Sequence, residues 1–353
     1  MIYAVVMAGG IGERFWPLST PHRPKQLIPL FEDKPLLIRA IERLDPLVPA
    51  ERTFVVTSKT LGKTVGNLIP MLPRENLILE PVGKNTAPAA ALATLKVLMK
   101  DPNGIIAMFP SDHFIEEKED FQRQLTHASR LAEQDNIVTF GVPPDYPSTG
   151  YGYIQVGEQM EDIGGEKSYR VQRFVEKPDI ETARGYVKDG SYLWNSGIFV
   201  WGGEFFLAQV QEHSPDIYRL LMEIRQDLDL DNEKAIERFY GEVEKISVDY
   251  AIMERSRQMV VIPASFKWDD LGSWTALERI CSKDAGGNVV IGEAILNDVK
   301  DSIVYSEDGA VALLGVKDLV VVRLKDLTMV CHRSKVEEVR KLAEQWRSES
   351  GGE

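Results

Sequence analysis

Short, mostly apolar runs separated by amphipathic segments constrain the fold of this chain most strongly. These runs cover residues 3–7, 53–57, 76–80, 105–109 and 137–141. The charged, amphipathic segment 117–133 has the length of a crossover helix. Strands that alternate with helices predict an α/β fold with a mostly parallel sheet and helices on both faces. Ligands of such sheets bind beyond the carboxyl ends of the strands, so the loops after these runs are the first places to look for a site.

The first run leads into a glycine-rich loop that could hold phosphate. Its small residues are Ala8, Gly9, Gly10 and Gly12. Glycine lets backbone N–H groups approach an anion, and Arg14 and Lys25 place positive charges at the two ends of the segment. A tight strand-to-helix turn without a ligand would explain the glycines but not the two cations. We therefore interpret residues 8–25 as a phosphate-binding loop.

Two common phosphate loops do not fit this segment. The P-loop pattern requires a Gly-Lys-Ser/Thr end, which is missing here. A dinucleotide-binding loop would continue directly into a helix, but Pro17, Pro21 and Pro24 interrupt it. The loop is therefore expected to stay irregular until about Lys34, with a helix over residues 36–44.

The segments 9–19 and 24–27 resemble the signature of the sugar-1-phosphate nucleotidyltransferases, and most closely that of the mannose-1-phosphate guanylyltransferases. The resemblance extends over nearly the whole chain. It implies a Rossmann-like nucleotidyltransferase domain. One position departs from the pattern, because the family usually has a hydroxyl residue before the arginine and this chain has Glu13.

Net charge and composition narrow the possible partners. The formal net charge of −13 argues against a nucleic-acid-binding surface, which is usually basic. An anionic substrate would have to be neutralised by local cations and a divalent metal ion. No apolar run has the length of a membrane span, and no signal peptide is visible, so we expect a cytoplasmic protein without a membrane partner. Cys281 and Cys331 are too few for a disulfide framework.

The loop after Glu80 is a candidate for base recognition. Asn85 and Thr86 stand just before an alanine-rich helix, where they could cap that helix or hydrogen-bond to a base. Guanine presents two donors and an acceptor on its Watson–Crick edge. The resemblance of residues 80–88 to the guanylyl branch of the family implies that the base is guanine.

Asp112 follows the apolar run 105–109 and is a candidate ligand for Mg²⁺. An aspartate there could equally cap the next helix, and spacing alone leaves both interpretations open. The resemblance implies that Asp112 and Asp270 together hold Mg²⁺, with Asp269 as the neighbour most easily confused with Asp270. His113 is expected to be structural.

Three later motifs are interpreted as a sugar-phosphate subsite. Their residues are Gly150, Tyr151, Gly152, Glu176, Lys177, Asn195 and Gly197. Carboxylate and amide groups suit sugar hydroxyls, and a lysine suits the sugar phosphate. Glu176 and Lys177 alone could be an exposed ion pair of little consequence, but the glycine corners and the family pattern favour the subsite. Asp249 could cap a helix or face the sugar.

The C-terminal part changes character after residues 282–288. We expect a nucleotidyltransferase domain over residues 1–282 and a small β-rich domain over residues 288–353. Short β-runs at 303–305, 310–314, 319–324 and 328–331 precede a helix over 335–346. The resemblance implies a left-handed β-helix here. We expect this domain to serve homodimer formation or packing on the first domain rather than chemistry.

The resemblance implies that the substrates are GTP and mannose-1-phosphate and that the products are GDP-mannose and pyrophosphate. The sugar phosphate would attack the α-phosphorus directly, with Arg14, Lys25, Asp112, Lys177 and Asp270 as the catalytic set. Transfer to another sugar-1-phosphate or from another nucleotide is the nearest alternative. A sugar-nucleotide sensor without catalytic activity is a second alternative. An appended isomerase would show a His/Glu metal cluster, which the sequence lacks.

Overall fold

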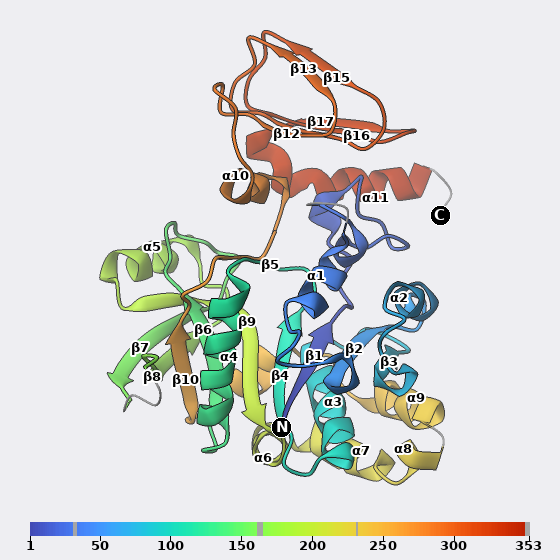
Figure 1. The fold of residues 1–353 in the computed structure, drawn as a ribbon, viewed down its shortest axis with the longest axis vertical. Coiled ribbons are helices and arrows are strands. Elements are labelled where there is room, and N and C mark those ends of the chain that lie inside the picture. The colour runs from blue at the N-terminus through green and yellow to red at the C-terminus, as the bar shows by residue number, and fades with distance from the viewer. Residues whose placement is uncertain (31–33, 161–164, 231, 350–353) are drawn as a thin grey trace. The chain divides into compact units, whose positions relative to one another are not determined.

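The computed structural model describes residues 1–30, 34–160, 165–230 and 232–349, and the chain divides into two compact units (Figure 1). The large unit comprises Met1–Gly9, Ala40–Ser111 and Ile115–Trp268. The small unit comprises Gly10–Arg39, Asp112–Phe114 and Asp269–Glu353. The chain therefore passes between the units several times, and the glycine-rich loop from Gly10 onward belongs to the same unit as the C-terminal part.

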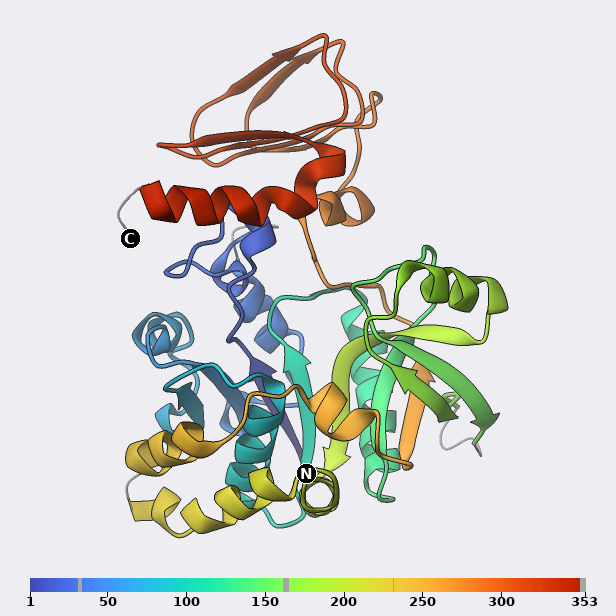
Figure 2. The same ribbon diagram turned by 180° about the vertical axis from the view of Figure 1, so that it is seen from behind.

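In the described residues, nine strands of the large unit form one sheet with the order β3-β2-β1-β4-β9-β6-β10-β8-β7 (Figures 1 and 2). Their bounds are β1 Ile2–Met7, β2 Thr53–Ser58, β3 Leu77–Glu80, β4 Ile105–Pro110, β6 Ile137–Val142, β7 Tyr153–Gln159, β8 Tyr169–Val175, β9 Tyr192–Gly202 and β10 Met259–Pro263. All five apolar runs that the sequence indicated are strands of this sheet.

The strand directions explain where the loops of interest emerge. Strands β3, β2, β1 and β4 are parallel neighbours, with Val5 beside Phe54 on one side and beside Met108 on the other. Strand β9 is antiparallel to both β4 and β6, so the sheet is mixed beyond β4. Because β1, β3 and β4 run in the same direction, the segments after Met7, Glu80 and Pro110 leave from the same edge of the sheet.

Helices cover both faces of the sheet, as the pattern predicted. The helices that lie wholly in the large unit are α2 Gly62–Leu68, α3 Thr86–Lys100, α4 Lys118–Ala132, α5 Ile180–Asp189, α6 Gly203–His213, α7 Pro215–Ile224, α8 Asp227–Leu230 and α9 Asn232–Glu242. Successive side chains of β4 point to opposite faces. Met108 belongs to the core cluster that includes α3, and the Phe109 ring lies 5.8 Å from the Phe121 ring of α4. Helices α3 and α4 therefore cover opposite faces.

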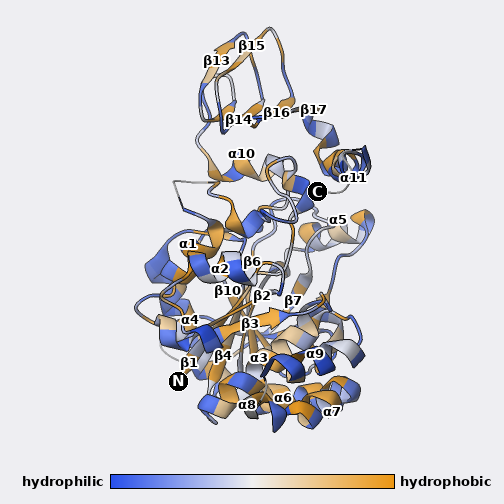
Figure 3. Ribbon diagram, turned by 90° about the vertical axis from the view of Figure 1, so that its right-hand side faces the viewer, coloured by the Kyte–Doolittle hydropathy of each residue, from blue (hydrophilic) through white to orange (hydrophobic). Residues whose placement is uncertain are grey.

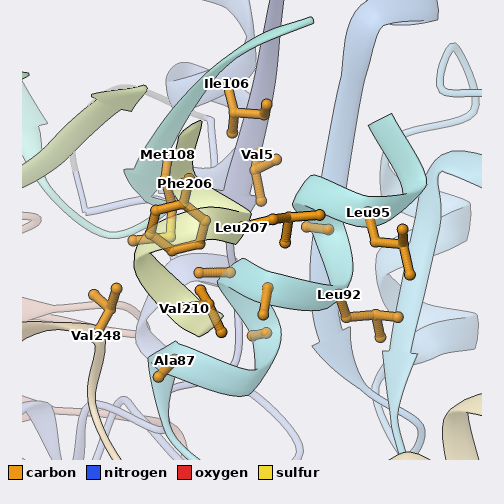
Figure 4. Packing of buried hydrophobic residues seen from close by; sticks show 14 of the residues in the cluster. Val5, Ala87, Leu92, Leu95, Ile106, Met108, Phe206, Leu207, Val210 and Val248 are labelled. Atoms are coloured by element: carbon orange, nitrogen blue, oxygen red, sulfur yellow. The ribbon is translucent and has the colours of Figure 1, made fainter. Parts of the chain in front are cut away.

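The main core lies between the sheet and α3, α6 and α7. Figure 4 shows Val5, Ile106 and Met108 of the strands packed with Leu92 and Leu95 of α3. Both leucines are almost fully buried, and such burial stabilises the fold by about 2 kcal/mol for each side chain. In Figure 3 the strands of this sheet are coloured mainly as hydrophobic, whereas the outer helices show both colours, as expected for elements with one buried face.

The C-terminal strands of the small unit form a β-helix. Strands β12 Val289–Ile291, β14 Ile303–Ser306 and β16 Leu319–Arg323 are parallel neighbours, and β13 Ala294–Asn297 is parallel to β15 Val311–Leu314. Strand β17 Thr328–His332 closes the first sheet in the antiparallel direction. The chain thus alternates between two stacks of short parallel strands, as a β-helix does.

Short helical elements attach the glycine-rich loop to this unit. They are η1 Glu13–Phe15, η2 Lys25–Leu27, α10 Leu277–Ile280, η7 Arg333–Glu338 and α11 Val339–Glu349. The Phe15 ring lies 5.0 Å from the Trp274 ring, and both residues share a core with Val336 and Val339. The loop is therefore anchored by apolar packing although most of it is not regular. Helix α1 Leu36–Glu42 begins in this unit.

A search of the described helices for a segment long and apolar enough to cross a bilayer found none. This result agrees with the sequence, in which no sufficiently long apolar run is present.

Candidate active site

Lys25 is the central cation of the small unit. It lies at the start of η2, and only 4% of the residue is exposed. Its Nζ donates to Asp112 Oδ2 at 2.9 Å and to the backbone oxygen of Asp270 at 2.6 Å. The Phe15 ring centroid is 5.7 Å from the same nitrogen. One buried lysine thus joins the loop to two segments that lie far away in the sequence.

Gly12 allows this approach. Its φ of +72° is in the left-handed region, and a Cβ at this position would lie 2.4 Å from Cβ of Lys25. Both facts exclude a side chain there without a shift of the backbone. The Lys25 backbone N–H also donates to Ile11 O at 3.0 Å, which holds the two ends of the loop together.

The charged residues expected to bind the triphosphate and the metal line one cavity of about 560 Å³, whereas Ala8, Gly9 and Gly10 of the glycine-rich loop do not. Its walls include Arg14, Lys25, Asp112 and Asp270, all from the small unit. The sequence places these residues up to 256 positions apart, and folding brings them to one cavity. The further lining residues are Ile11, Gly12, Glu13, Phe15, His113, Leu271, Gly272 and Arg340.

The structure distinguishes the two neighbouring aspartates. Asp269 is only 6% exposed and accepts from Arg279 through both oxygens, at 2.5 and 3.0 Å. Asp270 lines the cavity, and its Oδ1 accepts from the Gly272 backbone N–H at 3.0 Å. Asp269 is therefore engaged in a bidentate ion pair, and Asp270 is the carboxylate that faces the cavity.

The carboxylates of Asp112 and Asp270 suit Mg²⁺ better than they suit a metal ion whose ligands all come from the protein. Nowhere in the described ranges do three or more His, Cys, Asp or Glu side chains come together as a metal cluster. Mg²⁺ takes one or two carboxylates and completes its shell with water and substrate phosphates. Asp112 and Asp270 supply hard oxygen ligands of this kind.

Lys25 also keeps Asp112 ionised. Burial is the largest single influence and would raise the pKa of Asp112, but the charge and hydrogen bond of Lys25, the nearby His113 and a backbone hydrogen bond together outweigh it, and the pKa lies below the ordinary value. The pKa of His113 also lies below its ordinary value, but for a different reason. Burial lowers its pKa, and the attraction of Asp112 offsets this only in part. An ionised carboxylate in this cavity suits the binding of a hard cation.

Arg14 and Glu13 each pair with the C-terminal helical segment. Arg14 Nε lies 2.9 Å from Glu337 Oε2, and Glu13 Oε1 accepts from both terminal nitrogens of Arg347 at 3.0 Å. The bond to Arg347 gives a physical reason for an acid at position 13, where the family usually has a hydroxyl residue.

In the large unit, Asn85 and Thr86 make structural hydrogen bonds. Asn85 caps α3 and accepts from the Thr86 N–H at 2.9 Å, with its backbone at φ +69°. Thr86 Oγ1 accepts from the Val248 N–H at 2.9 Å. The capping alternative is therefore realised, and the Asn85 residue itself is exposed. Asn85 is the more exposed of the two residues, and its side-chain amide is accessible to a ligand.

Glu80 is a candidate residue that the sequence analysis did not single out. It ends β3, it is 7% exposed, and its Oε1 accepts from the Tyr240 hydroxyl at 2.9 Å. A Cβ added to Gly9 would lie only 3.2 Å from Glu80 Oε2, so the glycine leaves space next to this oxygen. Burial raises the pKa of Glu80 to about 7. An acid at the carboxyl end of a parallel strand was the available signal, as it was for Asp112.

Most of the expected sugar-phosphate residues form one cluster in the large unit. Glu176 is bound by Lys177 Nζ at 2.5 Å, and a Cβ on Gly152 would lie 2.5 Å from Glu176 Oε2. The Asn195 N–H donates to Gly152 O at 2.8 Å. Lys177 has an unusual positive φ of 47°. Strained non-glycine residues of this kind occur often at binding sites.

Asp249 completes this cluster. It accepts from Asn195 Nδ2 at 3.4 Å. Burial and the nearby Glu176 raise its pKa to about 7, although Lys177 partly opposes this. The sequence left Asp249 between a helix cap and a sugar contact, and the structure places it beside Asn195.

The remaining expected residues shape the surroundings of the cluster. Gly197 has a φ of +71°, and its N–H donates to Asn195 Oδ1 at 3.1 Å. The Tyr151 ring contacts the Trp194 ring at 4.9 Å. The Gly150 N–H donates to Ser148 Oγ at 3.1 Å. Tyr151 and Gly150 therefore support the wall of the cluster.

Comparisons with known proteins identify the family of this chain. The family model described as "Nucleotidyl transferase" matches residues 3–286, and the model described as "MannoseP isomerase/GMP-like beta-helix domain" matches residues 292–346. A mannose-1-phosphate guanylyltransferase of Escherichia coli K12 is 39% identical over 98% of this chain and 73% of its own length. The enzyme ManC of Salmonella typhimurium LT2 is also 39% identical, over 97% of this chain and 72% of its own length.

A solved structure gives the same result. The crystal structure described as mannose-1-phosphate geranyltransferase from Thermus thermophilus is 36% identical to this chain, with a TM-score of 0.89 over 98% of this chain and 99% of that one. The expected fold class, a nucleotidyltransferase domain followed by a β-helix, is confirmed. The chain belongs to the nucleotidyl transferase family, and within it to the branch of the mannose-1-phosphate guanylyltransferases.

Proposed function

We propose that this protein is a mannose-1-phosphate guanylyltransferase that converts GTP and mannose-1-phosphate to GDP-mannose and pyrophosphate. The observation that carries the proposal is the single cavity lined by Arg14, Lys25, Asp112 and Asp270. Relatives with this name match the chain over nearly its full length. Two cations and two carboxylates are what a triphosphate with a divalent ion requires.

The reaction we propose is a direct displacement at the α-phosphorus. A phosphate oxygen of mannose-1-phosphate forms the new bond, and the bond between the α-phosphorus and the bridging oxygen of pyrophosphate breaks. The attacking phosphate is already ionised at neutral pH, so catalysis consists of alignment and charge stabilisation. Arg14 and Lys25 would stabilise the charge on the α-phosphate and the departing pyrophosphate, and Lys177 would bind the incoming sugar phosphate.

Asp112 and Asp270 would hold the metal ion, and we propose that it is Mg²⁺. When bound, this ion supplies positive charge to the phosphate oxygens. In the structure the Lys25 ammonium is bonded to one oxygen of Asp112, and the carboxylate is kept ionised. The other oxygen of Asp112 is then the natural ligand for the cation.

We propose that Glu80 reads the guanine base. A carboxylate accepts hydrogen bonds only, and guanine presents two adjacent donors, N1–H and N2–H, on one edge. Tyr240 occupies one oxygen of Glu80, and the absence of a side chain at Gly9 leaves space beside the other. Asn85 would contribute its exposed amide. Adenine and the pyrimidines do not offer this pair of donors in the same arrangement.

We propose that Glu176, Asn195 and Asp249 bind the hydroxyl groups of mannose. All three are hydrogen-bonding side chains that lie in one cluster with Lys177. Gly152 leaves room for Glu176.

The experiment that tests the function measures pyrophosphate release for four nucleoside triphosphates, each with several sugar-1-phosphates and Mg²⁺. We expect turnover to be highest with GTP and mannose-1-phosphate. A preference for thymidine or uridine triphosphate with glucose-1-phosphate would replace this assignment by the nearest alternative. Binding of GTP without pyrophosphate release under any pairing would favour the sensor.

We further propose a homodimer in the cytoplasm, with a boundary in the sequence between residues 282 and 288. The compact small unit begins earlier, at Asp269, and also takes in Gly10–Arg39 and Asp112–Phe114. The two family models meet between residues 286 and 292, which supports the boundary. Exposed apolar side chains on the β-helix, Ile295, Leu314 and Val330, support a subunit contact. Light scattering after gel filtration tests the dimer, and cell fractionation tests the location.

A further inference from the structure

One cation of the C-terminal helix lines the same cavity as the expected catalytic residues. Arg340 is the second residue of α11 and borders the cavity with Arg14, Lys25, Asp112 and Asp270. It lies outside residues 3–286, which the nucleotidyl transferase family model matches, and within residues 292–346 of the β-helix model. The charge therefore comes from outside the segment that matches the nucleotidyl transferase family model.

The rotation of α11 directs Arg340 to this side of the helix. Val339 and Ala343 are buried in the core of the small unit and fix the helix orientation. Arg347 stands seven residues after Arg340, two helical turns along the same side. Its guanidinium binds Glu13, which also lines the cavity. The same edge of the helix thus carries two arginines toward the glycine-rich loop.

Arg340 differs from the other two cations because its charge has no partner among the described residues. Lys25 is paired with Asp112, and Arg14 is paired with Glu337. Among the described residues, Arg340 makes no hydrogen bond or ion pair, and it is exposed. An arginine without a carboxylate partner keeps its full set of donors for a ligand. Its planar fork matches the oxygens of a phosphate group in a bidentate way.

We propose that Arg340 binds the triphosphate of the nucleotide substrate and, after the reaction, the pyrophosphate product. This inference rests on the proposed function, because it needs a polyphosphate in the cavity. Lys25 donates to Asp112 and to the backbone oxygen of Asp270, so part of its hydrogen-bonding capacity is used within the protein, and a triphosphate in this cavity would gain from a further cation. Arg340 provides that charge, and the β-helix domain thereby forms part of the nucleotide site.

The test compares Arg340→Gln with a matched control on the same helix. The control is Lys341→Gln, which also removes one positive charge, from a side chain that is paired with Glu338 at 2.8 Å and does not line the cavity. We expect Arg340→Gln to raise the KM for GTP and the inhibition constant of pyrophosphate by about tenfold, as for the loss of one hydrogen bond to a charged group. The KM for mannose-1-phosphate and the melting temperature should stay unchanged.

Two additional measurements separate phosphate binding from a structural role. The KM for GTP should depend less steeply on salt concentration in Arg340→Gln than in the parent protein, because one ionic contact is lost. Arg340→Lys should restore part of the affinity, since it keeps the charge but not the fork. Lys341→Gln should behave like the parent in every assay.

The outcomes distinguish this inference from the proposed function. If the parent turns over GTP and Arg340→Gln has unchanged constants for GTP and pyrophosphate, the inference is wrong and the function stands. If the parent releases no pyrophosphate with any substrate pair, the proposed function is wrong. Equilibrium dialysis with GTP then decides the inference. Weaker binding by Arg340→Gln alone supports it, and equal binding by the parent and both glutamine variants, or no binding by the parent, overturns it.

Discussion

Replacing Glu80 by glutamine should make the protein more stable at alkaline pH and less able to use GTP. Burial raises the pKa of Glu80 to about 7 in the folded protein, from an ordinary value of 4.5. A carboxyl group with a raised pKa contributes most below pH 4.5, and this contribution is lost as the pH rises through 7. A difference of about 2.5 pH units corresponds to about 3 kcal/mol, because each unit is worth about 1.4 kcal/mol.

Glutamine keeps the acceptor for Tyr240 and cannot ionise. We therefore expect Glu80→Gln to exceed the parent in free energy of unfolding by about 3 kcal/mol at pH 8 and by less than about 1 kcal/mol at pH 5. Urea titrations at both pH values, followed by circular dichroism, measure this difference. A difference that stays the same at pH 5 and pH 8 would show that the ionisation of Glu80 does not oppose folding.

The kinetic half of the prediction concerns the base. Glutamine replaces one acceptor oxygen by a donor, which conflicts with one of the two guanine donors and suits the donor–acceptor edge of adenine. We expect the ratio of kcat/KM for GTP to that for ATP to fall by at least about tenfold, since a buried unpaired donor costs about 1–3 kcal/mol. An unchanged ratio would refute the assignment of Glu80 to the base. A stability gain with lost selectivity would show that the ionised acid is retained for binding.

Three further predictions follow from the contacts of the two units. Lys25→Met should lower kcat by about 100-fold or more, because loss of a charge-stabilising donor in a catalytic site typically has an effect of this size. Pyrophosphate release measures kcat. The pKa of Asp112 should also rise in this variant, because the charge of Lys25 is lost. Gly12→Ala should lower both activity and melting temperature, because its Cβ would lie 2.4 Å from Lys25, whereas Gly10→Ala meets no atom within 4 Å. Asp249→Asn should raise the KM for mannose-1-phosphate and leave that for GTP unchanged.

Each of these predictions can fail in a specific way. Turnover of Lys25→Met within about tenfold of the parent would remove Lys25 from the catalytic set. Equal melting temperatures for Gly12→Ala and Gly10→Ala would mean that the loop rearranges freely. For Asp249→Asn, an effect on GTP as large as that on mannose-1-phosphate would argue against a sugar contact.

Much of the fold could be predicted from the sequence because it depends on local periodicity. The runs at 53–57 and 137–141 appear as β2 and β6, and the segment 117–133 as α4. Short apolar blocks bounded by polar or turn residues favour strands that are buried on both faces, so these elements could be predicted from local composition. The antiparallel insertion of β9 between β4 and β6 was not predictable, because strand neighbours depend on contacts between distant segments.

For the candidate site, too, some features follow from short segments of the sequence and others depend on contacts between distant residues. The sequence by itself determined the residue types, the glycine-rich loop and the acid after β4, because each is a property of a short segment. Only the tertiary structure decided that Asp270 rather than Asp269 faces the cavity, since the choice depends on Arg279. It also brought Arg340 to that cavity and buried Glu80 beside Tyr240. Such pairings join residues far apart in the chain, and no local pattern encodes which distant side chain will be the neighbour.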